Sequence, residues 1–125
     1  MKVMILPHVT IISVYRSLAV PVQQLCYALN EVLSLSCSQL FNIFIGDYNI
    51  NWLDESYRRP LYNLFVNYNN YRQLISTYIT DNQTTIEHIY TNLSESQANG
   101  QILEIYFSDH KPICVLINCF HWENS

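Results

Sequence analysis

The sequence predicts an α/β fold, and two observations support this class. Apolar, β-branched runs typical of strands alternate with a stretch that carries its apolar residues at helical spacing. Half of the 125 residues are hydrophobic and only 13% are charged, which favours a folded chain. We see no linker and no internal repeat, so we expect residues 1–125 to form a single domain around a sheet of about six strands.

The first half of the chain is predicted as strand, helix, strand. Val9–Tyr15 is β-branched and aromatic, as strands are. Pro21 suits the first turn of a helix, and apolar residues recur at helical spacing over residues 22–33. The helix should end near residues 36–38. Residues 41–45 are mostly apolar and predict a buried strand, which completes a β-α-β unit.

The second half is predicted to hold one short helix and four strands. Asp54 or Ser56 suits the cap of a helix with Pro60 early in it. Residues 67–71 are rich in Asn and predict a turn, and residues 93–100 predict a polar loop. The predicted strands cover residues 74–79, 85–90, 102–107 and 113–120.

The charge balance argues against tight, independent binding to DNA. The net charge is −4, with six Lys and Arg residues in all. Arg58, Arg59 and Arg72 fall in one stretch, and we interpret them as a solvated helix face rather than a basic patch. This balance still permits an active site that binds one phosphate through a metal.

The four cysteines predict free thiols in a reducing, intracellular compartment. They form no CxxC pair and no His/Cys spacing typical of zinc. Cys114 and Cys119 lie in an apolar run, where cysteine acts as a small hydrophobe. No segment reaches the roughly 18 uninterrupted apolar residues of a membrane span, so we expect no membrane partner.

Short polar clusters interrupt or end three of the predicted strands. In α/β folds, ligands bind beyond the carboxyl ends of strands. The polar residues at these breaks are Asp47 and Asn49, Glu87 and His88, and Asp109 and His110.

Each cluster also has a plain structural interpretation. Gly-Asp-x-Asn is a common turn sequence, and Asp109 could cap local backbone. Glu87 could pair with a nearby Lys or Arg. We interpret His8 and His88 as structural, because a histidine in a strand is usually satisfied by packing.

Taken together, the clusters fit phosphodiester cleavage. That reaction needs a divalent metal on oxygen ligands, a group that orients or deprotonates water, and donors to the phosphate. Two Asp, one Asn and a carboxylate-supported His supply most of these parts.

The order of the clusters resembles the later motifs of the endonuclease/exonuclease/phosphatase superfamily. The resemblance spans residues 9–120. Within the superfamily, the motifs most resemble those of non-LTR retrotransposon endonucleases, which are similar to apurinic/apyrimidinic endonucleases. The Ser-Asp-His-x-Pro motif after a Gly-Asp-x-Asn motif is fairly specific, whereas either alone is not. The segments that carry it are Val14-Tyr15-Arg16, Ile45-Gly46-Asp47-Tyr48-Asn49, Thr85-Ile86-Glu87-His88-Ile89 and Ser108-Asp109-His110-Lys111-Pro112-Ile113.

The resemblance implies a four-layered α/β/β/α sandwich of the DNase I type and a Mg²⁺-dependent phosphodiesterase acting on DNA or another phosphodiester. It also implies a role for each matched residue. Asp47 would orient or activate water, Asn49 would help bind the phosphate, Tyr15 would sit near the phosphate, His110 would contact the scissile phosphate, Glu87 would orient that histidine, and Asp109 would belong to the metal site.

The sequence departs from the family at three places. The family has Asp where Glu87 stands, and Ser17-Leu18 replaces a proline expected after Tyr15-Arg16. No Asn or Glu precedes Tyr15, so the family's N-terminal motifs, with a metal-binding Glu, are missing. We therefore expect half a sandwich with an exposed sheet face, covered by a homodimer or a partner, and weakened Mg²⁺ binding and catalysis.

Three functions follow from this resemblance. The first is an active or residually active Mg²⁺ nuclease. The second is a non-catalytic remnant that serves as a partner-binding or dimerising module. The third, a relative acting on phosphoinositides or sphingolipids, ranks below both because the motif context is retrotransposon-like.

Overall fold

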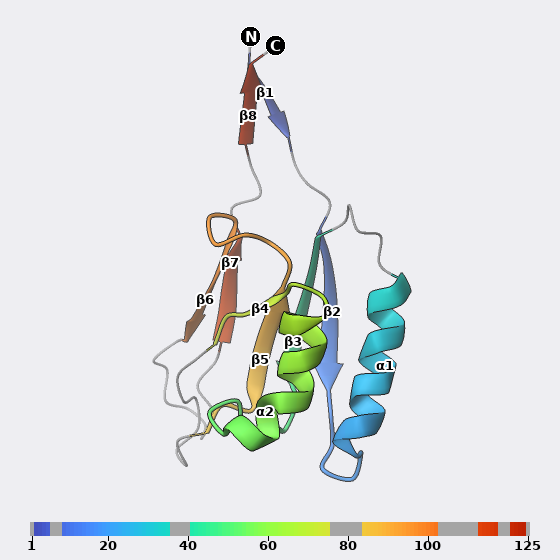
Figure 1. Ribbon diagram of the computed structural model, residues 1–125. Helices are drawn as coiled ribbons and strands as arrows, with labels where there is room; N and C mark the ends of the chain where they lie inside the picture. The colour runs from blue at the N-terminus through green and yellow to red at the C-terminus, as the bar shows by residue number, and fades with distance from the viewer. Residues whose placement is uncertain are drawn as a thin grey trace.

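The computed structural model describes residues 2–5, 9–35, 41–75, 84–102, 113–117 and 121–124. These residues confirm the α/β class, with helices on one side of a mixed sheet (Figure 1). In chain order the elements are β1 (Lys2–Ile5), β2 (Val9–Tyr15), α1 (Val22–Leu35), β3 (Phe41–Asp47), α2 (Glu55–Leu61), the π-helical turn η1 (Tyr62–Asn67), β4 (Arg72–Gln73), β5 (Glu87–Thr91), β6 (Ala98–Ile102), β7 (Ile113–Ile117) and β8 (His121–Asn124).

The central sheet has four strands in the order β2-β3-β5-β4. Strands β2 and β3 are parallel and joined through α1, which confirms the predicted β-α-β unit. Strand β5 is antiparallel to β3, and β4 is antiparallel to β5. Strand β3 continues two residues past the predicted end, through Gly46 to Asp47, because both residues still pair with β2 and β5.

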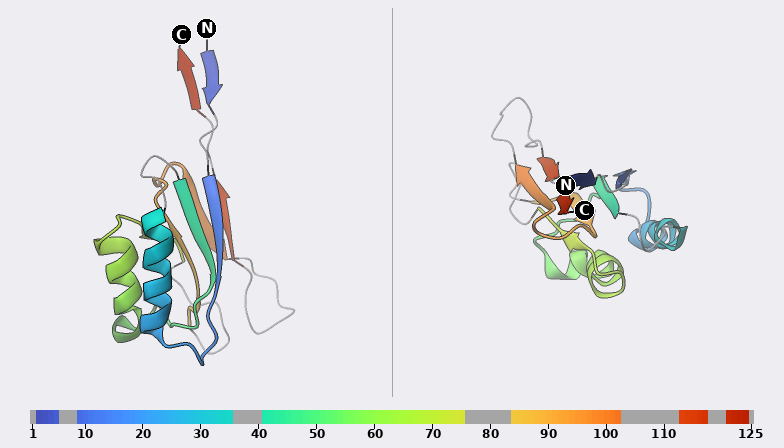
Figure 2. Two further views of the ribbon diagram at one scale, coloured as in Figure 1. Left: turned by 90° about the vertical axis from the view of Figure 1, so that its right-hand side faces the viewer. Right: turned by 90° about the horizontal axis from the view of Figure 1, so that it is seen from above.

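Both helices pack on one face of this sheet, as the side view in Figure 2 shows. Helix α1 buries Leu25, Leu29 and Leu33, which recur at the four-residue spacing of one helical face. These side chains join a core that includes Phe44 of β3 and Tyr90 of β5. The larger core therefore lies between the helices and the sheet.

The hairpin formed by β6 and β7 covers the opposite face. Ile43 and Ile89 of the sheet are fully buried there, in a second core cluster with Ala98 of the hairpin and two loop residues, Ile75 and Leu93. The view from above in Figure 2 places the hairpin and the helices on opposite sides of the sheet. The central strands are thus enclosed between the helix layer and the hairpin.

The prediction of one sheet of about six strands is wrong. The described strands form a four-stranded sheet and two separate antiparallel pairs, β6-β7 and β1-β8. Ala98–Ile102 is β6, so the predicted loop at residues 93–100 ends two residues early. Of the strand predicted at residues 102–107, only the first residue is described.

The strand predicted at residues 74–79 is absent at its first two residues. Strand β4 is Arg72–Gln73 and ends before Leu74. The Gln73 side chain donates to the carbonyl oxygen of Ile75 and accepts from its backbone N–H, which occupies groups that a longer ladder would use. Residues 76–79 lie outside the described part of the chain.

Helix α2 begins at Glu55, and of the two predicted cap residues, Asp54 and Ser56, the structure has Asp54 as the cap. Its carboxylate accepts hydrogen bonds from the backbone N–H groups of Ser56 at 3.0 Å and Tyr57 at 3.2 Å. Pro60 lies inside the helix, which continues as the wider turn η1. The N–H of Tyr68 closes this turn on the carbonyl of Asn63, five residues back.

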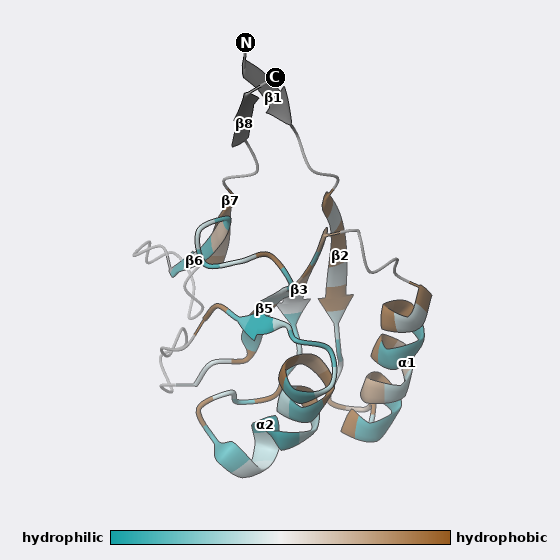
Figure 3. Ribbon diagram, turned by 45° about the horizontal axis from the view of Figure 1, so that its top comes forward, coloured by the Kyte–Doolittle hydropathy of each residue, from teal (hydrophilic) through white to brown (hydrophobic). Residues whose placement is uncertain are grey.

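Edge strand β2 keeps apolar side chains exposed. Ile11 and Tyr15 are 64% and 75% exposed, although their strand belongs to the core sheet. Figure 3 shows the β2 ribbon largely in the brown of hydrophobic residues. Among the described strands, exposed large apolar side chains therefore lie on β2, with Leu116 of β7 a further one at 51%.

The described cysteines match the prediction of free thiols. Cys26 and Cys114 are free and half-buried, and burial raises the pKa of the Cys26 thiol. Cys37 and Cys119 lie outside the described residues. No helix in the described ranges is long and apolar enough to cross a membrane.

Candidate functional site

Three of the predicted site residues form one row across the sheet. Tyr15 of β2 pairs with Asp47 of β3, and Asp47 pairs with Glu87 of β5. Directly paired residues project from the same face of a sheet, with Cβ atoms about 5 Å apart. Residues two apart in a strand share a face. Ile45, two residues before Asp47, and Ile89, two residues after Glu87, both pack in the core on the hairpin side, so the row lies on that face.

The row places two carboxylates directly opposite each other. Asp47 and Glu87 are half-buried, and Tyr15 beside them is exposed. Like charges at directly opposed positions destabilise a sheet, and the whole chain has only ten acidic residues to distribute.

The backbone after β3 turns sharply and brings Asn49 back toward β2. The N–H of Asn49 donates to Asp47 Oδ1 at 2.9 Å, and Asn49 adopts a left-handed conformation with φ of 51°. Asn49 Nδ2 donates to the carbonyl oxygen of Arg16 at 2.6 Å. Gly-Asp-x-Asn therefore forms a turn, as its plain interpretation predicted, and the same turn fixes one oxygen of Asp47.

Gly46 is required by the close approach of β2. Its φ is 157°, and a Cβ atom there would lie 1.8 Å from the carbonyl oxygen of Val14. No side chain fits in that space. The glycine thus lets β3 stay paired with β2 up to Asp47, which places the carboxylate in the row.

Arg16 is a further residue at the site, and sequence reasoning assigned it no role. It is 7% exposed, and its guanidinium donates to the carbonyl oxygens of Val20, Tyr48 and Asn49. The signal in the sequence was its place directly after Tyr15 in a chain with few cations.

His88 is structural, as predicted. It is fully buried, with Nε2 at 2.8 Å from the carbonyl of Ile50 and 3.1 Å from that of Thr85, and with Nδ1 at 2.8 Å from the hydroxyl of Tyr90. Burial lowers the pKa of His88 from 6.5 to about 4, against the opposing effect of the two carbonyl contacts. The ring is therefore neutral at physiological pH, and both of its nitrogens are occupied by buried protein groups.

The described residues alone do not form a metal site. They include no group of three His, Cys, Asp or Glu side chains able to hold a metal ion. Asp47 and Glu87 do supply paired carboxylate oxygens, the ligand type that Mg²⁺ prefers, so the donor chemistry fits in part. Asp109 and His110, predicted for the metal and the scissile phosphate, lie outside the described residues.

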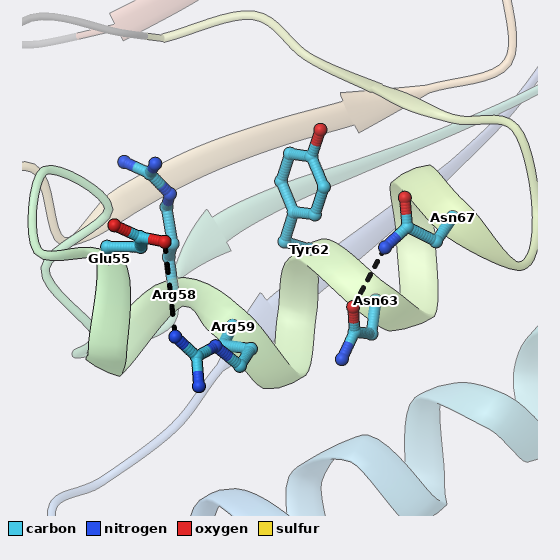
Figure 4. Close-up of a pocket in the computed structure, with 6 residues that line it drawn as sticks. All are labelled: Glu55, Arg58, Arg59, Tyr62, Asn63 and Asn67. Atoms are coloured by element: carbon cyan, nitrogen blue, oxygen red, sulfur yellow. Dashed lines mark hydrogen bonds and ion pairs between the residues drawn. The ribbon is translucent and has the colours of Figure 1, made fainter.

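A polar cavity of about 360 Å³ lies along α2 and η1 (Figure 4), and none of its lining residues belongs to this row. Arg59 and Glu55 form an exposed ion pair there at 3.9 Å, and Arg58 donates to the carbonyl of Trp52. The predicted solvated helix face is confirmed for Arg59. The same prediction is wrong for Arg72, because this residue lies on β4 and its guanidinium donates to the carbonyl oxygens of Leu93 and Ala98.

A second cavity, of about 440 Å³, adjoins the turn that follows β3. Arg16 and Asn49 form part of its wall, so it opens next to the candidate site and not at a distance from it. The other lining residues are Leu18, Val22, Ile50, Asn51, Tyr57 and Ile86.

No family model, no curated protein and no solved structure matches this chain. The resemblance to the endonuclease/exonuclease/phosphatase superfamily therefore stays a prediction drawn from the order of the motifs.

Proposed function

We propose that this chain is a Mg²⁺-dependent phosphodiesterase-like domain that acts on DNA, with activity weaker than that of a complete endonuclease/exonuclease/phosphatase enzyme. The observation that carries the proposal is the row of Tyr15, Asp47 and Glu87 at one end of the sheet, with Asn49 in the adjoining turn. These residues are far apart in the sequence and are the ones that the motif order selects.

The geometry supports a distinct role for each side chain. Asp47 Oδ1 is held by the Asn49 N–H, while Oδ2 has no hydrogen bond within the described residues and is available to a water nucleophile. Asn49 Nδ2 uses one hydrogen on Arg16, which leaves the second for a phosphate oxygen. The exposed Tyr15 hydroxyl is a further donor to the phosphate.

Glu87, Asp109 and His110 complete the proposal. Glu87 would fix the His110 tautomer, and His110 would donate to the scissile phosphate. Asp109 would belong to the Mg²⁺ site. When bound, Mg²⁺ supplies charge stabilisation to the phosphate, which accounts for a large part of the acceleration in such sites.

A second candidate is a partner-binding or dimerising module without catalysis. The exposed strip of Ile11 and Tyr15 on edge strand β2 favours it, because apolar side chains on an unpaired edge suit an interface. This candidate predicts a dimer or a complex and no cleavage.

The test is nicking of supercoiled plasmid DNA in Mg²⁺ and in EDTA by the full chain. Asp47→Ala and His110→Ala are the site variants, and Glu55→Ala is the matched control because it removes an exposed carboxylate on α2. Nicking that needs Mg²⁺, persists in the control and vanishes in both site variants supports the nuclease. If wild type and the three variants all gave the same trace of nicking with and without Mg²⁺, the nuclease proposal would be rejected in favour of the binding module.

A further inference from the structure

Arg16 binds the whole turn that carries Asp47 and Asn49. Its Nε donates to the carbonyl oxygen of Tyr48 at 2.7 Å, and its Nη2 donates to that of Asn49 at 2.8 Å. Its backbone N–H donates to the carbonyl oxygen of Asp47 at 2.9 Å. Each of the three consecutive turn residues thus gives its carbonyl oxygen to Arg16.

The turn also binds back to Arg16. Asn49 Nδ2 donates to the Arg16 carbonyl oxygen at 2.6 Å, so the same amide that would meet the phosphate is oriented by this residue. The third guanidinium contact, from Nη1 to the carbonyl of Val20 at 2.5 Å, ties the group to the segment before α1. Arg16 therefore joins the end of β2 to the end of β3.

The charge of Arg16 is compensated in an unusual way. The residue is buried, and within the described residues it makes no ion pair with a carboxylate. Buried charges are normally paired or fully hydrogen-bonded, and here backbone carbonyl oxygens do the whole compensation. Moving the turn would leave both the cation and these carbonyls unsatisfied.

We propose that Arg16 is the positioning residue of the candidate site. Its planar, forked guanidinium holds residues 47–49 in the one conformation, left-handed at Asn49, that directs the Asp47 carboxylate and the Asn49 amide to the phosphate. This inference rests on the proposed phosphodiesterase function. Arg16 itself touches no reacting atom.

Lysine cannot replace Arg16 in this role. A guanidinium presents donors in several fixed directions, whereas an ammonium is a compact point charge on a flexible stem. Arg16→Lys therefore keeps the positive charge but cannot hold the carbonyls of Val20, Tyr48 and Asn49 together.

The matched control is Arg72→Lys. The Arg72 guanidinium is also part-buried and also donates to backbone carbonyls, those of Leu93 and Ala98. Arg72 pairs with Thr91, at the far end of β5 from Glu87. The two substitutions remove the same kind of contact, one at the site and one away from it.

The experiment measures the full chain in two ways. Amide hydrogen exchange of Asn49, relative to the core amide of Phe44, reports whether the turn is held. Nicking kinetics in Mg²⁺ report kcat and KM separately. In Arg16→Lys we expect Asn49 exchange to accelerate by about tenfold or more, and kcat to fall by about 100-fold with KM changed far less. Arg72→Lys should match wild type in both.

The two proposals fail separately. If wild type does not nick DNA, the proposed function fails and the exchange measurement alone decides the inference. Asn49 exchange and kcat equal to wild type in Arg16→Lys would overturn the positioning role. Should Arg16→Lys not fold, Arg16→Gln, which removes the buried charge and keeps two donors, takes its place under the same criteria.

Discussion

The rings of Tyr48 and His88 stack face to face, with centroids 4.9 Å apart and planes inclined by 11°. Tyr48 follows Asp47 in the chain, and His88 follows Glu87. Both rings are fully buried, and Tyr48 belongs to the core between the helices and the sheet, whereas the two carboxylates are half-buried. The stacked pair is therefore the buried counterpart of the carboxylate pair, and the core contact directly supports the candidate site.

Asn49→Gly should strongly reduce function without unfolding the chain. Glycine adopts the φ of 51° at this position freely, so we expect the free energy of unfolding to change by less than about 1 kcal/mol. Loss of the amide should reduce plasmid nicking by about 100-fold. Asn70→Gly is the control, because Asn70 has φ of 59° and lies away from the row. Equal nicking by both variants would rule out a phosphate role for Asn49.

Acid should destabilise the protein through His88. The pKa of His88 is about 4 in the folded chain and 6.5 in its ordinary state, so the unfolded chain binds the extra proton between these values. Stability is full above about pH 6.5 and falls as the pH drops toward about 4, by about 3 kcal/mol. Urea unfolding across this range measures the slope, and His88→Gln should flatten it. An unchanged slope in the variant would assign the acid sensitivity to other groups.

Tyr48→Phe should stabilise the protein. The Tyr48 hydroxyl is buried and has no hydrogen-bond partner among the described residues, and burial raises its pKa. Removing an unsatisfied buried hydroxyl should raise the free energy of unfolding by about 1 kcal/mol. Tyr90→Phe is the opposite case, since the Tyr90 hydroxyl lies 2.8 Å from His88 Nδ1 and its loss should destabilise. Chemical unfolding of both variants gives the two signs, and a loss of stability in Tyr48→Phe would point to an unrecognised partner.

Phe65→Ala should be among the most damaging core substitutions. Phe65 is fully buried and stacks on Tyr90 at 3.9 Å between centroids, with Phe44 against its edge at 5.2 Å. We expect a loss of about 3–5 kcal/mol in the free energy of unfolding. Leu53→Ala, at a 40% exposed leucine, should cost less than about 1 kcal/mol. Similar losses in the two variants would contradict the placement of the core.

Gly46→Ala should disrupt the join between β2 and β3. A Cβ there meets the Val14 carbonyl oxygen at 1.8 Å, so the strands must separate, and we expect a loss of more than about 4 kcal/mol. Gly100→Ala is the comparison, because its nearest contact is longer, 2.7 Å to Leu74 Cβ. Thermal unfolding measures both, and a Gly46→Ala protein as stable as wild type would show that the approach of β2 is looser than described.

Local features of the fold could be predicted from the sequence. Val9–Tyr15, the apolar face of α1 and the Asp54 cap depend on residues a few positions apart, and the structure confirms all three. The separation of the β6-β7 hairpin from the main sheet depends on packing against Ile43 and Ile89, which no local pattern reveals.

In the candidate site, too, local sequence predicts some residues, whereas others depend on contacts between distant parts of the chain. Asp47 and Asn49 were found because a turn follows an apolar strand. The role of Arg16 was missed because its contacts to Tyr48 and Asn49 span 32 and 33 residues. Glu87 was placed inside a strand, and it reaches Asp47 only because β5 runs antiparallel to β3, so that the start of one meets the end of the other.

The shared register of β3 and β5 also limits how this chain can change in length. Inserting or deleting one residue within either strand would exchange its two faces beyond that point. Asp47 or Glu87 would then turn toward Tyr48 and His88 in the core, and Phe44 or Tyr90 would turn away from the helices. Single-residue insertions should be tolerated in the exposed turn at residues 94–97 and rejected inside Phe41–Asp47 and Glu87–Thr91. Folding and the candidate chemistry would be lost together.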